Sequence, residues 1–435
     1  MNQQTLTLVA KVCDGAKLQD VLQTIAGTRV PVGTRDQPAF FADPKLGIHF
    51  ARLVHIPSDG RFDAWLALES NFDSEVVEPA RARDVHIEAM IQGQSEGMRA
   101  LFSCCDGFRE DASLEDLTEF CKRHLVDATA TYEGHVARSL ARIHLEQRVR
   151  DVVLDFVATQ ETMPRFELFD QIRKHVRTQS QLDAGLRGLD IDRPPESSPD
   201  PQQRSDELDA GPPLLDGPIG SALEILRNAS RIAEWNGEDA GYDLRRAQES
   251  WTNVDRKSFS DLAAGEDYGL QNALTHVVPL KSGVAREDVL LSVHAIINRL
   301  SHEYYSAVGA LGGIPTIHFA KWLLIDGGKR LVFLSNYDHS WESYLGDFVE
   351  SAHGLNLAWS CTEKYPKTSW LAFGGAFDEE AFKAWARAYQ RPTQVFYSAY
   401  PDLSIAVIDN NTWIRYGLHF DPSAIDLDRW FRRLT

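Results

Sequence analysis

Two stretches that lie far apart in this chain repeat one another. Residues 47–74 read GIHFARLVHIPSDGRFDAWLALESNFDS, and residues 316–340 read TIHFAKWLLIDGGKRLVFLSNYDHS. A second pair precedes them, because LTLVAKVCDGAKLQDVL at 6–22 aligns with LTHVVPLKSGVAREDVL at 274–290. Identical residues at matching spacings indicate a duplicated domain, which restricts the chain to folds built from two copies of one unit.

Each copy carries the same order of periodic patterns. Alternating apolar residues predict strands, and apolar residues three and four apart predict helices. In the first copy we expect strands near 6–13, 47–56, 63–71 and 98–105, and helices after Gly15 and near 74–92. In the second we expect strands near 272–280, 315–326, 329–336 and 355–361, and helices near 284–300 and 340–353. The order β-α-β-β-α-β predicts a ferredoxin-like unit.

The strand at 317–325 has apolar side chains on both of its faces, with Lys321 on one face and His318 on the other. A sheet with helices on one side only would keep a polar second face, so this second face must be covered as well. The other copy's sheet is the natural cover. We therefore predict an α+β fold of two tandem ferredoxin-like repeats, packed sheet to sheet as a pseudo-twofold barrel with a helical connector.

The repeats divide the chain into three parts. Residues 1–135 hold the first repeat and a following helix, residues 136–268 form a helical connector, and residues 269–435 hold the second repeat with an aromatic C-terminal extension. Within the connector, residues 189–213 are acidic, rich in proline and almost free of apolar side chains, which predicts a mobile loop. The final DPSAIDLDRWFRRLT has the spacing of an amphipathic helix that docks on the body or on a partner subunit.

Composition narrows the classes of partner. A formal net charge of −18 repels nucleic acid and anionic membrane surfaces. The five cysteines lack paired spacing, which argues against a disulfide framework and favours a cytoplasmic location. No run of apolar residues is long enough for a transmembrane segment. We expect a small-molecule ligand or substrate, with a partner enzyme and a homo-oligomer left open.

Several polar residues recur in both copies. His49 and His318 stand mid-strand, and a satisfied histidine within a sheet explains each better than a metal ligand does. Asn71 with Asp73, and Asn336 with Asp338, stand where a strand gives way to a helix, so we expect them to cap the first helical turn. The chain has no phosphate-binding loop, zinc-protease motif or nucleophile elbow.

The C-terminal extension is rich in aromatic residues. VFYSAYPDLS, with Tyr397 and Tyr400, and NNTWIRYGLHF, with Trp413 and Tyr416, are expected to form a pair of strands. Their tyrosines could line a cavity or fill a core, and the sequence favours neither.

The segment RLVFLSNYDHSWESYLGDFVES resembles the strand and helix of dye-decolorising peroxidases, a tandem-domain haem branch of the dimeric α+β barrel superfamily that is related to chlorite dismutase-like proteins. The resemblance covers roughly residues 1–110 and 270–362 and is more one of topology than of motifs. It implies haem as the cofactor and peroxidase chemistry as the activity.

The resemblance also implies roles for three residues. Asp106, in the sequence SCCDG, matches part of the family's GxxDG loop and would be the acid–base group. His302 would bind the haem iron as axial ligand, and Lys321 stands where the family has a distal arginine. Each also fits a structural role, namely Asp106 in a turn, His302 at a helix end and Lys321 as a surface cation.

Three hypotheses about function follow. The first is a haem-binding, peroxidase-like oxidoreductase that acts on a small aromatic or apolar substrate. The second is a non-catalytic barrel protein that binds a small apolar ligand or a partner enzyme. The third is a cofactor-free monooxygenase with a pocket lined by residues such as His276, Trp322 and Tyr397.

Overall fold

The computed structural model describes most of the chain outside its middle. The described residues are 2–136, 138–179, 182, 262, 267, 269–281, 284–302, 310–351, 356–366, 368–369 and 373–434. The predicted loop at 189–213 lies outside them. Within them, no helix is both long enough and apolar enough to span a bilayer.

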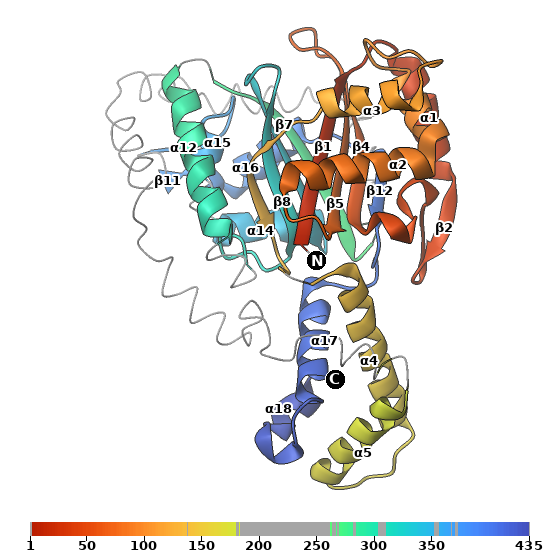
Figure 1. Ribbon diagram of the computed structural model, residues 1–435. Coiled ribbons are helices and arrows are strands. Elements are labelled where there is room, and N and C mark those ends of the chain that lie inside the picture. The colour runs from red at the N-terminus through yellow and green to blue at the C-terminus, as the bar shows by residue number, and fades with distance from the viewer. Residues whose placement is uncertain are drawn as a thin grey trace.

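Two four-stranded antiparallel sheets form the centre of the protein (Figure 1). The first has the order β1-β5-β4-β12, with β1 (Asn2–Lys11), β5 (Trp65–Ser74), β4 (Ile48–Ile56) and β12 (Val395–Ser398). The second has the order β6-β8-β9-β7, with β6 (Ala128–Glu133), β8 (Ile317–Ile325), β9 (Arg330–Asp338) and β7 (Gln271–Pro279). The mixed α+β class with antiparallel sheets is therefore confirmed.

The last strand of each half pairs with the sheet of the other half. β6 comes from the first half of the chain and pairs with β8, whereas β12 comes from the second half and pairs with β4. β6 was not predicted, whereas β12 lies in the segment VFYSAYPDLS that was predicted to be a strand, although not one of the first sheet. A ferredoxin-like unit would instead keep its fourth strand in its own sheet.

The predicted strands near 98–105 and 355–361 are wrong. The first segment completes α2 (Pro79–Phe102) and a turn, and the second is the short helix α15 (Asn356–Ser360). The periodicity of a short apolar run does not distinguish a strand from a buried helix. Tertiary packing favours the helix in both of these segments. The turns that follow still lie beside the first strand of each half, through the single bridges Val12↔Cys105 and Leu280↔Thr362.

The expected barrel is not closed. In the described part of the chain the two sheets share no hydrogen-bonded edge. The outer edge of β1 is occupied by the segments around Cys105 and Leu125, and the outer edge of β7 by those around Thr362 and Gln390. A strand edge whose backbone groups are already paired cannot form hydrogen bonds with the other sheet.

The sheets pack face to face, as the two-faced apolar pattern predicted. Valine, leucine and isoleucine side chains of both sheets form one cluster between them, including Val54, Val277 and Leu323. The outer face of the first sheet is covered by α1 (Gly15–Gly27), α2 and α3 (Leu114–Arg123). That of the second is covered by α12 (Val284–Leu300), α14 (Trp341–Glu350), α15 and α16 (Glu379–Tyr389).

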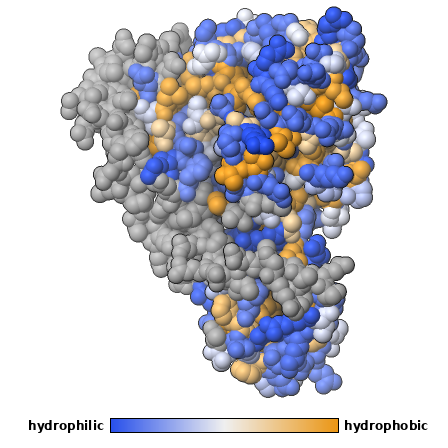
Figure 2. Space-filling model, in the orientation of Figure 1, coloured by the Kyte–Doolittle hydropathy of each residue, from blue (hydrophilic) through white to orange (hydrophobic). Residues whose placement is uncertain are grey.

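Four helices form a lobe beyond the ends of the sheets (Figure 1). They are α4 (Leu140–Ala158), α5 (Arg165–Thr178), α17 (Ile405–Gly417) and α18 (Leu427–Arg432). Their apolar side chains pack together, with Trp430 edge-on to Phe169 at 4.8 Å, and the outer surface of the lobe in Figure 2 is mainly hydrophilic. The C-terminal helix and its docking are thus confirmed, but the predicted strand around Trp413 is helical.

Candidate functional site

His302 lies just past the end of α12, and its side chain is exposed. Its Nδ1 is 2.7 Å from the carbonyl oxygen of Asn298. The residue lines a hollow of about 430 Å³ beside the first residues of β1. Its position at a helix end is as predicted, and its role as a haem ligand stays a prediction.

Lys321 is not the surface cation that the sequence allowed. It points between the two sheets and is only 2% exposed. Its Nζ lies 2.9 Å from Oε1 of Glu69 and also donates to the hydroxyl of Thr5. Burial lowers the pKa of Lys321, and Glu69 opposes that shift. An interior position between two apolar sheet faces required this carboxylate, because a buried cation without a partner is strongly unfavourable.

Asp106 lies in a turn near the opposite end of β1. Its carboxylate is exposed, and its backbone N–H donates to the carbonyl of Lys11 at 2.8 Å. Lys11 lies six positions along β1 from Thr5, the partner of Lys321, so the two sites are about 20 Å apart at roughly 3.3 Å per residue. The described geometry does not bring Asp106, Lys321 and His302 around one cavity, and it does not fit a haem site built from all three.

Glu69 is shared by two cations. Arg52 donates from Nε to Oε2 of Glu69 at 2.9 Å, while Lys321 occupies Oε1. The guanidinium of Arg52 also reaches the second sheet, donating to the carbonyls of Leu274 at 2.8 Å and Ser335 at 3.0 Å. Burial alone would raise the pKa of Glu69, but Lys321 and Arg52 outweigh it and the pKa is lowered. This triad joins the sheets electrostatically.

The histidines and aspartates that recur in both copies form equivalent pairs. His49 lies 3.0 Å from Oδ1 of Asp73, and His318 lies 2.8 Å from Oδ1 of Asp338.

The expectation that these aspartates and their neighbours Asn71 and Asn336 cap the helix after each strand is wrong, because Glu78 caps α2 and Ser340 caps α14. Each aspartate caps a distant helix instead, while Asn71 donates to Glu69 and Asn336 accepts from Arg52. Oδ2 of Asp73 accepts from the N–H of Leu140 at the start of α4, and Oδ2 of Asp338 accepts from that of Ile405 at the start of α17.

Two more residues complete this buried junction, namely Tyr400, which the sequence placed either in a core or at a cavity, and His135, which sequence reasoning missed. The hydroxyl of Tyr400 lies 3.0 Å from Nδ1 of His49 and 3.2 Å from Nε2 of His135, which is 3.3 Å from Nδ1 of His318. Burial is the main cause that lowers the pKa of His135, and the neighbouring His318 and His49 lower it further. The junction is sealed from solvent, and no cluster suited to a metal ion occurs among the described residues. We interpret it as the anchor of the helical lobe.

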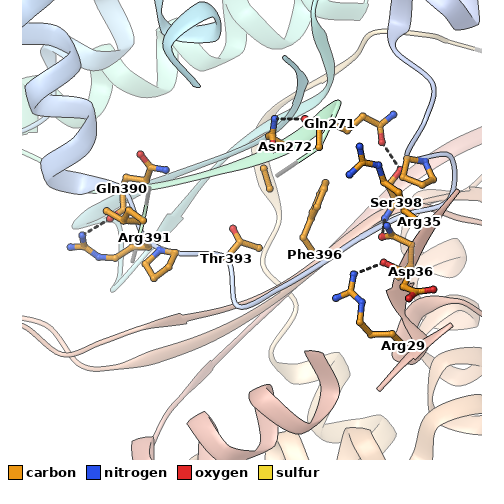
Figure 3. Close-up of a pocket in the computed structure, with 16 residues that line it drawn as sticks. Arg29, Arg35, Asp36, Gln271, Asn272, Gln390, Arg391, Thr393, Phe396 and Ser398 are labelled. Carbon is orange, nitrogen blue, oxygen red and sulfur yellow. Dashed lines mark hydrogen bonds between the residues drawn. The ribbon is translucent and has the colours of Figure 1, made fainter. Parts of the chain in front are cut away.

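The larger of the two described cavities lies elsewhere, with a volume of about 520 Å³ (Figure 3). Three segments build it: the hairpin of β2 (Arg29–Val32) and β3 (Arg35–Pro38), the start of β7, and the residues from 390 to 401 that include β12. Both halves of the chain therefore contribute to one cavity. Among its lining residues that carry charge are three arginines and one carboxylate, namely Arg29, Arg35, Arg391 and Asp36.

The arginines differ in how far they are neutralised. Arg35 lies 3.6 Å from Oδ1 of Asp402. Arg29 donates to the backbone carbonyls of Ala26 and Asp36, and Arg391 donates to the carbonyl of Gln390 at 3.0 Å. Neither Arg29 nor Arg391 forms an ion pair with any residue that the structure describes.

Arg391 is the more buried of these two cations. Burial is the main cause of a lowered pKa at Arg391, the nearby Arg330 adds to it, and Asp59 and Tyr389 oppose it only in part. The Nε of Arg391 is buried without a hydrogen-bond partner among the described residues. A bound anion would supply the missing acceptor and relieve this penalty.

The remaining walls are fixed in place. Gln271 donates to the carbonyl of Leu403 at 2.6 Å and accepts from the hydroxyl of Ser398 at 2.5 Å. Asn272 donates to the carbonyl of His339 at 2.6 Å. The ring of Phe396 stands between the basic groups in Figure 3 and offers an apolar surface. A rigid, partly apolar wall with two unneutralised arginines suits an organic anion.

Sequence reasoning did not find this cavity. Arg391 is more than 350 positions from Arg29 and Arg35 in the sequence, and it joins their cavity only because β12 pairs with the first sheet. The hairpin was nevertheless visible in RVPVGTRDQP, where two alternating segments flank a Gly33 turn.

No family model, curated protein or solved structure matches this chain. The function is therefore argued from the geometry of the cavity.

Proposed function

We propose that the protein is a binding protein for a small organic anion with an aromatic or apolar body, held in the cavity of Figure 3. The observation that carries this proposal is that Arg29 and Arg391 face one cavity without any ion pair to described residues. Half-buried charges are normally paired, so the half-buried guanidinium of Arg391 marks a place for an acidic ligand, and the exposed Arg29 adds a second positive charge there.

The charge of the whole chain strengthens the argument. A protein with a net charge of −18 has carboxylates in excess, yet the described residues that line the cavity include three arginines and a single aspartate. A local positive field within an acidic protein attracts small anions and leaves the outer surface repulsive to nucleic acid. The ring of Phe396 favours a ligand with a flat apolar portion.

Isothermal titration tests the proposal with benzoate as the probe and benzamide as its uncharged counterpart. We expect benzoate to bind and benzamide to bind at least tenfold more weakly. Arg391→Gln should weaken benzoate binding about tenfold or more, because a hydrogen bond to a charged group contributes about 1.5–3 kcal/mol. Arg29→Gln should have a smaller effect, because Arg29 is exposed.

Arg81 on α2 provides a matched control, since it is exposed and lines neither described cavity. Arg81→Gln should leave benzoate affinity unchanged. The thermal midpoint of ligand-free Arg391→Gln should not fall, because the substitution removes a charge whose burial Asp59 and Tyr389 compensate only in part. Equal affinity of the wild type for benzoate and benzamide would refute the proposal.

The fold suggests an origin for the protein. We propose that its two halves are tandem ferredoxin-like repeats of the dimeric α+β barrel superfamily. The same order of strand, helix, hairpin and helix in both halves supports this, as do the equivalent pairs His49–Asp73 and His318–Asp338. A cytoplasmic location remains our proposal, because the five cysteines are sparse and lack paired spacing in the sequence.

Haem binding at His302 remains an alternative prediction with a specific basis. The exposed imidazole lines a cavity, and its Nε2 is not engaged by any described residue. A visible spectrum with added haem decides it. A stoichiometric Soret band that is lost in His302→Ala would support this alternative, and no band in either protein would end it.

A further inference from the structure

A second cavity is rich in hydrogen-bond acceptors that lack partners. The hollow of about 430 Å³ lies where the first residues of β1 meet the end of β6 and the end of α12. Its lining residues are Asn2, Gln3, Gln4, Thr5, Pro79, Thr131, Glu133, Val136 and His302. Among these, Glu133 is the only acidic residue.

Glu133 is the main feature of this hollow. Its side chain is half-buried and makes no hydrogen bond or ion pair with any described residue. The charged groups that face it are Asp73 at the end of β5 and Lys321 on β8, and Lys321 is already bound by Glu69. Burial is the main cause that raises the pKa of Glu133 to about 7, and the negative charge of Asp73 is a smaller one. A half-buried carboxylate without a partner needs a counter-charge.

Two further acceptors lie in the lining. The amide nitrogen of Gln3 donates to the carbonyl of Arg138 at 3.0 Å, which fixes the amide orientation, and its Oε1 is buried without a partner. Nδ1 of His302 faces the carbonyl of Asn298, which can only accept, so Nδ1 carries the proton and Nε2 is left as an acceptor.

We propose that this hollow is a second binding site, which takes the ammonium group of a small organic amine. An ammonium group brings one positive charge and three N–H donors, which match one carboxylate and two neutral acceptors. A structural metal ion is a poorer match, because such sites use about four protein ligands and the described residues of this lining offer one carboxylate and one imidazole. The site is independent of the arginine-lined cavity and of any ligand bound there.

Isothermal titration with n-butylamine tests the proposal, with n-butanol as the uncharged counterpart. We expect the amine to bind at pH 8 and the alcohol to show no binding. The amine stays protonated throughout, whereas Glu133 ionises across this range, so affinity at pH 8 should be about tenfold higher than at pH 6. Glu133→Gln should abolish both the binding and its pH dependence.

Glu119 on α3 gives a matched control, since it is exposed and lines neither described cavity. Glu119→Gln should bind n-butylamine as the wild type does. If Glu133→Gln does not fold, carbon NMR of the wild type decides, because the amine should shift the carboxyl resonance of Glu133 and lower its titration midpoint. Undiminished binding by Glu133→Gln, an unshifted resonance, or equal binding of amine and alcohol would overturn the proposal.

Discussion

Removing the shared carboxylate of the inter-sheet triad should be far more damaging than removing one of its cations. Glu69 holds both Arg52 and Lys321, and all three side chains are at most 2% exposed. Glu69→Gln keeps the shape of the side chain but leaves two buried cations without a counter-charge. Breaking a buried pair in this way costs about 3–5 kcal/mol.

Lys321→Met is the matched comparison. It leaves the pair of Arg52 and Glu69 intact, and it removes a cation whose burial is itself unfavourable, as the lowered pKa of Lys321 indicates. We expect a loss of about 1 kcal/mol or less, because replacement of a buried charge by an apolar side chain of similar volume is often close to neutral. The two substitutions should therefore differ by at least about 2 kcal/mol in the free energy of unfolding.

Urea unfolding at pH 7, followed by tryptophan fluorescence, measures both values. The pKa of Glu69 is lower in the folded protein, so its contribution is present above its unfolded pKa and is lost as pH falls through the folded pKa. The difference between wild type and Glu69→Gln should thus persist at pH 5. An effect of Glu69→Gln no larger than that of Lys321→Met would refute the role assigned to the triad.

Two further predictions concern the anchor of the lobe and a buried histidine. Asp338→Ala should speed hydrogen exchange at the N–H of Ile405 and leave exchange at Leu140 unchanged, because the Asp338 carboxylate caps only α17. Asp73→Ala should speed exchange at Leu140 and leave Ile405 unchanged, because the Asp73 carboxylate caps only α4. Equal effects of either substitution on both amides would contradict this prediction. Burial lowers the pKa of His276 to about 3, so the unfolded chain binds its proton first and stability is lost as pH falls below about 6.5. His276→Phe should therefore flatten the dependence of unfolding free energy on pH between 6 and 4 by up to about 1.4 kcal/mol per pH unit, and an unchanged slope in urea titrations would count against it.

Local pattern was enough to predict much of the fold. The strands that contain the recurring His-x-Ala-type segments, the helices that follow them and the face-to-face packing of the sheets all follow from apolar periodicity. Alternation showed which side chains share a face of β8 with Lys321, but the burial of Lys321 was not predicted, because its partner Glu69 comes from another sheet and could not be inferred from spacing.

The exchange of β6 and β12 between the sheets could not be predicted. Pairing partners of a short strand depend on which edges remain free after the body has packed, and no local pattern records that. The cavity could not be predicted for the same reason. Arg391 precedes β12 in the chain, and it lines the same cavity as Arg29 and Arg35 because β12 pairs with the first sheet. Asp73 and Asp338 show the same effect, because capping was foreseeable and the identity of the capped helix was not.

The most direct test of the anion-binding proposal is to locate an anion in the protein. Crystals soaked with 4-bromobenzoate should show an anomalous bromine signal inside the cavity, with the carboxylate near Arg391 and the ring against Phe396. Crystals of Arg391→Gln soaked in the same way should lack that signal. Bromine found only outside the cavity in the wild type, or equally strong in the cavity of the variant, would contradict the account.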